Sequence, residues 1–137
     1  MNVVVIDGQG GLLGAQLIKE ILLKVEGAKI TAIGTNAIAT AAMLKAGAKN
    51  AATGENPLIV ASRKADVIVG PIGIVIADSL LGEITPKMAA AVGQADAVRV
   101  LIPMNKCGNY VAGVSDYNTG ALIEDAVQKL KDLLKKA

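Results

Sequence analysis

The chain has 137 residues, which is the usual length of one domain, and 53% of them are hydrophobic. Basic and acidic side chains nearly balance, at 14 against 12, and only two side chains are aromatic. The basic face and the stacking platforms that nucleic-acid binding requires are therefore not evident. With no histidine and one cysteine, Cys107, the chain lacks the usual ligands of a zinc site and cannot form an internal disulfide.

The sequence also argues against secretion and membrane insertion. No basic region precedes the first apolar stretch, so no signal peptide is indicated. The longest apolar run, 67–77, is too short to span a bilayer and is interrupted by Gly70, Pro71 and Gly73. We expect a cytoplasmic protein with one domain over residues 1–137 and no membrane or nucleic-acid partner.

The first half of the chain alternates short apolar runs with helical segments. The pattern predicts three strand–helix pairs. A strand over 2–6 precedes a helix over 12–25, and a strand over 29–33 precedes a helix over 37–46 with Gly47 as its cap. A strand over 50–52 precedes a helix from Pro57 onward. The first helix has one apolar stripe, formed by Leu13, Leu17, Ile21 and Val25.

The second half begins with a clear strand over 66–69. Residues 70–84 are ambiguous: a buried packing segment is favoured, and a mobile lid is the alternative because glycines can act as hinges. The remaining predictions are a helix capped by Thr85 and Pro86, a strand over 97–102, an edge strand over 110–114, and a last helix from Asn118 or Thr119. The stripe Leu122, Ala126, Leu130 and Leu133 would face the core.

This alternation of strands and helices predicts βαβ units with right-handed crossovers. The expected fold is α/β, a three-layer, doubly wound and mostly parallel sheet of the Rossmann-like class. The sequence does not reveal the strand order.

In such a sheet the strand-to-helix loops share the carboxyl edge, where ligands bind. These loops combine glycine or proline with small or polar side chains, which ordinary turns also favour. The predicted ligand-binding residues are Asp7, Gly8, Gln9, Gly10, Gly11, Gly34, Thr35, Asn36, Thr53, Gly54, Glu55, Asn56, Gly70 and Asn105.

The loop after the first strand is the most specific of these signals, because its bare N–H groups would precede a helix, where a phosphate can bind. The dinucleotide fingerprint would place its third glycine at Leu13, whereas the spacing of Gly8, Gly11 and Gly14 resembles that of extended short-chain dehydrogenase-like proteins. A P-loop is excluded because no Lys-Ser or Lys-Thr follows. A tight turn without a ligand is the alternative.

The end of the second strand lacks the acid that binds a ribose diol and the arginine that binds a 2′-phosphate. It carries Gly34, Thr35 and Asn36 instead. This weakens NAD or NADP as the ligand and favours a smaller phosphorylated one. Thr35 or Asn36 as a plain helix cap is the competing interpretation.

The candidate catalytic residues are Asp7, Glu55 and Lys106. Each has a structural alternative: an Asx turn for Asp7, a helix N-terminus for Glu55 and a solvated loop charge for Lys106. Cys107 is more readily a packing residue than a reactive thiol, because no histidine exists to pair with it.

Two helices are too apolar for full exposure, because 37–46 has only Lys45 as a charge and 88–92 has none. We expect one of them to contribute to a homodimer interface.

Four strings, Ile6-Asp7-Gly8-Gln9-Gly10-Gly11, Gly34-Thr35-Asn36-Ala37-Ile38-Ala39-Thr40, Ala52-Thr53-Gly54-Glu55-Asn56 and Gly82-Glu83-Ile84-Thr85-Pro86-Lys87-Met88, carry a resemblance across nearly the whole chain. The sequence resembles a family of short uncharacterised bacterial proteins known only as a domain of unknown function. The resemblance implies a Rossmann-like fold and no established activity.

Three functions are compatible with these residues. The preferred one is a ligand-binding or sensory domain that holds a small anionic metabolite, such as a nucleotide or phosphorylated compound, at the glycine-rich loop. The second is a small enzyme that acts on a phosphorylated substrate or uses a dinucleotide in the same crevice. The third is a homo-oligomeric interaction protein without a ligand. The cofactor stays open, with a nucleotide or dinucleotide as the candidates.

Overall fold

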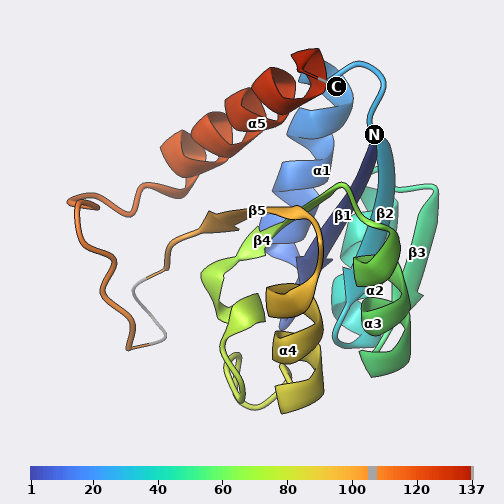
Figure 1. Ribbon diagram of the computed structural model, residues 1–137, viewed down its shortest axis with the longest axis vertical. Coiled ribbons are helices and arrows are strands. Elements are labelled where there is room, and N and C mark those ends of the chain that lie inside the picture. The colour runs from blue at the N-terminus through green and yellow to red at the C-terminus, as the bar shows by residue number, and fades with distance from the viewer. Residues whose placement is uncertain (105–107, 137) are drawn as a thin grey trace.

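The computed structural model describes residues 1–104 and 108–136 and has one parallel sheet flanked by helices (Figure 1). The strands are β1 (Asn2–Asp7), β2 (Lys29–Gly34), β3 (Asn50–Thr53), β4 (Val67–Pro71) and β5 (Val98–Ile102). The helices are α1 (Leu12–Lys24), α2 (Ala37–Lys45), α3 (Glu55–Lys64), the short 3-10 helix η1 (Ile72–Val75), α4 (Pro86–Gln94) and α5 (Thr119–Lys135).

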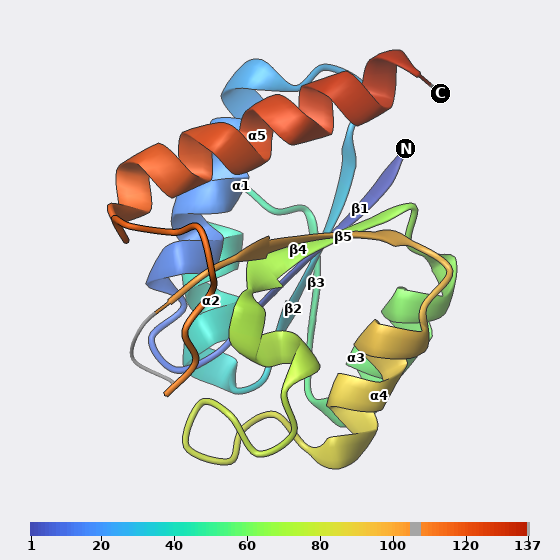
Figure 2. The same ribbon diagram turned by 60° about the vertical axis from the view of Figure 1, so that its left-hand side comes forward.

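Helices cover both faces of the sheet, which confirms the predicted Rossmann-like class (Figure 2). Helices α1, α2 and α5 enclose one apolar cluster, and α3, η1 and α4 enclose the other. The central strand β1 supplies both clusters, because Val3 and Val5 face the first and Val4 and Ile6 the second. A strand buried on both faces needs a continuous apolar run, and residues 3–6 form such a run.

The strands lie in the order β3-β2-β1-β4-β5, with every neighbouring pair parallel. The order changes direction between β1 and β4, and in open α/β sheets the crevice at such a point is where ligands bind. The loops after β1, β2 and β4 therefore form the edge of interest. Figure 1 shows the N-terminus and the end of α5 at the opposite end of the sheet.

The predicted boundaries of the helices and strands that form agree with the structure to within two residues, and the start of α3 and the end of β4 differ by that much. Helix α3 begins at Glu55 instead of Pro57, with Gly54 before it at φ 107°. Pro57 is the third helical residue, where its missing N–H has no intrahelical acceptor in any case. Strand β4 continues through Pro71, so Gly70 lies in a strand and not in a loop.

The predicted edge strand over 110–114 is wrong. These residues form no strand, and Gly113 has φ 88°, which a strand cannot accommodate. In the part of the chain that the structure describes, no helix is both long enough and apolar enough to cross a membrane.

Candidate functional site

The turn between β1 and α1 is held together by Asp7, whose side chain is only 6% exposed. One carboxylate oxygen accepts the N–H of Gly8 at 2.8 Å, and the other accepts the N–H of Gly14 at 2.7 Å. Asp7 therefore takes the structural role that was the alternative to catalysis, and it occupies one free N–H of the first turn of α1. Burial raises the pKa of this carboxyl group, with Glu83 adding to the rise, while the two backbone N–H groups oppose it.

Two glycines of this turn are required by close packing. Gly11 has φ 75°, and a Cβ atom there would lie 2.7 Å from the Cα atom of Ala39 in α2. A Cβ atom at Gly14 would lie 2.7 Å from the Met43 sulfur. Gly10 is different, because a Cβ atom there would meet nothing within 4 Å. Gly10 thus borders open space at the edge of the sheet.

The end of β2 places Thr35 and Asn36 beside this turn. Asn36 caps α2, because its side-chain oxygen accepts the N–H of Ala39 at 2.9 Å. Its side-chain nitrogen points the other way and donates to the Gln9 carbonyl at 3.0 Å. The predicted capping role of Asn36 is confirmed, and the same side chain also links the first two loops.

A residue that sequence reasoning did not select, Glu83, lies at the centre of this group. One of its carboxylate oxygens, Oε1, accepts the Thr35 hydroxyl at 2.6 Å, the Asn36 side-chain N–H at 2.7 Å and the Gln9 backbone N–H at 3.0 Å. Partial burial raises the pKa of Glu83, but the hydrogen bonds outweigh it and the net pKa lies below its ordinary value. Three donors from two loops therefore hold one anionic oxygen.

Glu83 belongs to residues 76–85, which we call the covering loop. It folds over the carboxyl edge and leads into α4 (Figure 2). Leu80 of this loop lies over Gly8, since a Cβ atom at Gly8 would be 2.9 Å from its methyl group. The Ser79 hydroxyl donates to the Gly73 carbonyl, and the Asp78 N–H donates to the Ile84 carbonyl at 2.7 Å.

The predicted segment 70–84 is buried at its ends and exposed in its middle. Ile74 and Ile84 are fully buried, so packing holds its two ends. Leu81 in the middle is 95% exposed. The buried interpretation describes the ends of the segment, and whether the middle moves is untested.

The loop after β3 lies farther along the same edge. The Thr53 and Thr40 hydroxyls are hydrogen-bonded at 2.7 Å, and the Gly54 N–H donates to the Gly34 carbonyl at 2.9 Å. Glu55 accepts the hydroxyl of Thr85, the residue that caps α4, at 2.5 Å. The helix-end role of Glu55 thus has structural support, and Asn56 beside it is exposed.

Of the other predicted site residues, one is described in a strand and the rest are not described. Gly70 is buried in β4, and a Cβ atom there would meet the carbonyl oxygen of Ile6, so this glycine permits close strand packing. Asn105, Lys106 and Cys107 lie outside the described residues.

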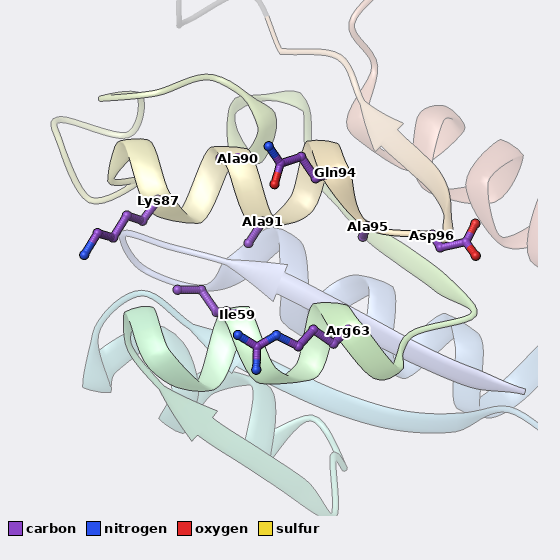
Figure 3. Close-up of a pocket in the computed structure, with 8 residues that line it drawn as sticks. All are labelled: Ile59, Arg63, Lys87, Ala90, Ala91, Gln94, Ala95 and Asp96. Atoms are coloured by element: carbon purple, nitrogen blue, oxygen red, sulfur yellow. The ribbon is translucent and has the colours of Figure 1, made fainter.

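A surface groove of about 530 Å³ lies between α3 and α4 (Figure 3). Its walls include Ile59 and Arg63 from α3, and Lys87 and Ala91 from α4. None of the predicted site residues that the structure describes lines it. The groove is thus separate from the edge built around Glu83.

The strand order defines a Rossmann-like α/β domain, and at its carboxyl edge three donors hold the Glu83 carboxylate. The chain belongs to the family described as Domain of unknown function (DUF3842), whose profile matches residues 2–135. A comparison with curated proteins found no match. Among solved structures, the fold is similar to that of a dodecameric FMN-dependent UbiX-like decarboxylase from Escherichia coli O157:H7. The TM-score is 0.53 at 14% sequence identity, covering 98% of this chain and 95% of the other.

Proposed function

We propose that this domain binds a small anionic ligand, a nucleotide or another phosphorylated metabolite, at the edge formed by the loops after β1 and β2. The observation that carries the proposal is the convergence of donors from Gln9, Thr35 and Asn36 on one carboxylate oxygen. An arrangement that holds one oxyanion offers the same donors to a phosphate oxygen. Gly10, which borders open space, leaves room for the rest of the ligand.

The beginning of α1 adds to this environment. The N–H groups of Leu12 and Leu13 lie in the first turn, where no intrahelical acceptor exists, and the helix dipole favours negative charge there. Asp7 and Glu55 both have hydrogen-bond partners within the protein. The proposal therefore concerns binding, and it assigns no proton transfer to either carboxylate.

A thermal-shift screen tests the proposal. The panel contains inorganic phosphate, sugar phosphates, nucleotides, dinucleotides and FMN, the last because the solved structure of similar fold is described as FMN-dependent. A ligand at about 100 times its Kd stabilises the native state by about 2.7 kcal/mol, which raises the melting temperature by several degrees.

The matched variants are Gly10→Val and Gly93→Val. A Cβ atom meets nothing within 4 Å at either position, so both variants are expected to fold. Gly10→Val places a side chain into the proposed ligand space, whereas Gly93 lies in α4. A thermal shift that disappears in Gly10→Val and persists in Gly93→Val supports the proposal. A panel without any shift, or a shift retained by Gly10→Val, contradicts it.

We also propose that the chain self-associates through α2. Ile38 and Leu44 on this helix are 71% and 47% exposed, and Ala41 between them is exposed as well. In α4, the other apolar helix, Met88, Ala89 and Val92 face the core. The solved structure of similar fold is described as dodecameric, which is compatible with assembly of this chain.

A further inference from the structure

We propose that the covering loop is a built-in competitor: the Glu83 carboxylate occupies the place of the ligand's anionic group and must leave when the ligand binds. This inference rests on the proposed function and adds a conformational step to it. The site as described is then its closed, self-occupied state. Ligand binding and displacement of the middle of the covering loop become one coupled event.

The hydrogen bonds support direct competition. Gln9, Thr35 and Asn36 all donate to the same oxygen, Oε1 of Glu83, at 3.0, 2.6 and 2.7 Å. A phosphate at this place needs the same three donors. The phosphate would also place its negative charge beside that of the Glu83 carboxylate, and like charges in one site repel. Glu83 and the ligand's oxyanion therefore exclude one another.

The covering loop also blocks access to the glycine turn. The space beside Gly8 is filled by this loop together with Thr35, because a Cβ atom there would lie 2.6 Å from the Thr35 hydroxyl oxygen, 2.9 Å from Leu80 and 3.1 Å from Glu83. A ligand that approaches the N–H groups of this turn meets Leu80 as well as the carboxylate. Release of Glu83 alone, without movement of the loop backbone, would leave this cover in place.

The backbone in the middle of the covering loop adopts a disfavoured conformation. Asp78, Leu80 and Leu81 have φ angles of 66°, 56° and 57°, a left-handed region that residues other than glycine rarely adopt. Leu81 is 95% exposed and gains no burial in return. Strain of this kind concentrates at switch regions, where the surrounding contacts maintain it.

The ends of the loop are firmly held. Ile84 is fully buried, and the Thr85 side chain accepts the Met88 N–H at the start of α4. At the other end, the fully buried Ile74 precedes the loop, and the Ile76 N–H donates to the Gly73 carbonyl at 3.0 Å. Fixed ends around a strained, exposed middle are the properties of a loop that can change between two positions. The contacts of Glu83 hold the closed one.

The test compares phosphate binding to the wild type, Glu83→Ala and Asp78→Asn. Asp78 is exposed on the same loop and does not contact the three donors, so Asp78→Asn removes one negative charge without vacating the site. Asparagine also tolerates the left-handed backbone at this position. Inorganic phosphate is the probe, and amide chemical shifts of Gln9 and Gly10 report binding.

Removal of a competing internal group raises the apparent affinity by the inverse of the open fraction. We expect Glu83→Ala to bind phosphate at least about tenfold more tightly than the wild type, and Asp78→Asn to change affinity by less than about threefold. Equal affinity of the wild type and Glu83→Ala overturns the competition and leaves the proposed function standing. Weaker binding by Glu83→Ala also overturns it, because Glu83 would then help to hold the ligand. Absence of binding in every variant overturns both.

Hydrogen exchange in the wild type gives a second test that does not depend on the stability of Glu83→Ala. Ligands usually slow exchange around their site. Displacement predicts the opposite for residues 76–85, because saturating phosphate would break the bonds between Asp78 and Ile84 and between Ile84 and Ser79. Slower exchange of this segment with phosphate contradicts the proposal.

Discussion

Asp7 and Glu83 are carboxylates at the same edge of the sheet, and the protein uses them differently. Asp7 is buried and accepts two backbone N–H groups. Asp7→Asn replaces one acceptor oxygen with an NH2 group that faces an N–H. We expect the free energy of unfolding, measured by urea denaturation, to fall by about 1–3 kcal/mol. Asp125→Asn on the exposed side of α5 is the control, with an expected change within about 0.5 kcal/mol. Equal effects of the two variants would contradict this role.

The lowered pKa of Glu83 predicts the direction in which the free energy of unfolding changes with pH. Its pKa in the folded protein lies below the ordinary value of 4.5 because of its hydrogen bonds, so its ionised form favours folding. That contribution is present above pH 4.5 and is lost as the pH falls through the folded-state pKa. We expect the stability difference between the wild type and Glu83→Gln to shrink below pH 4.5. A difference that is constant or grows on acidification would show that the bonds do not depend on the charge.

The pKa shift of Asp7 has the opposite sign to that of Glu83. The pH test therefore uses the difference in stability between the wild type and Glu83→Gln. The pKa of Asp7 is raised above 3.8, so its contribution is fully present below pH 3.8 and is lost as the pH rises through the folded-state pKa. The pH profile of the wild type alone would therefore mix the two effects.

At the scale of elements, the contact between α1 and α2 depends on Gly11. Its φ of 75° disfavours any side chain, and a Cβ atom would lie 2.7 and 2.8 Å from backbone atoms of Ala39. We expect Gly11→Ala to lower the free energy of unfolding by about 1–3 kcal/mol more than Gly10→Ala does. Chemical denaturation of the two variants measures this difference. Equal stabilities would mean that α2 moves aside without cost.

Elements with strong local signals could be predicted from the sequence, and those that depend on distant partners could not. The strand β1 and the stripe of α1 are recognisable because burial requires their apolar periods. Residues 110–114 have the composition of a strand, but Gly113 has φ 88°, a backbone conformation that a strand does not accommodate. Helix α3 begins early because Gly54 supplies a left-handed turn that composition does not reveal.

For the same reason, part of the candidate site could be predicted from the sequence and part could not. The glycine turn, Thr35 and Asn36 follow strands directly, so the sheet brings them together. Glu83 is 74 residues from Gln9 in the sequence, and only the path of the covering loop places it there. Its one sequence signal is an acid after Gly82 in a mostly apolar stretch, which also contains Asp78.

At the scale of the whole molecule, the exposed side of α2 predicts assembly. Ile38, Ala41 and Leu44 recur at three-residue spacing, so they lie on one side of the helix away from the core. Ala41→Glu introduces a charge whose burial in an interface is unfavourable, while in the free protein it stays in solvent. We expect light scattering to show assembly of the wild type and a lower mass for Ala41→Glu.

The control for this last variant is Ala121→Glu, which adds the same charge at an exposed position in the first turn of α5. An acid there complements the helix dipole, so the fold is retained and the assembly should be unchanged. Circular dichroism verifies that both variants are folded. A wild type that is monomeric at every concentration would contradict self-association. Loss of assembly in both variants would mean that charge repulsion, and not the α2 surface, is responsible.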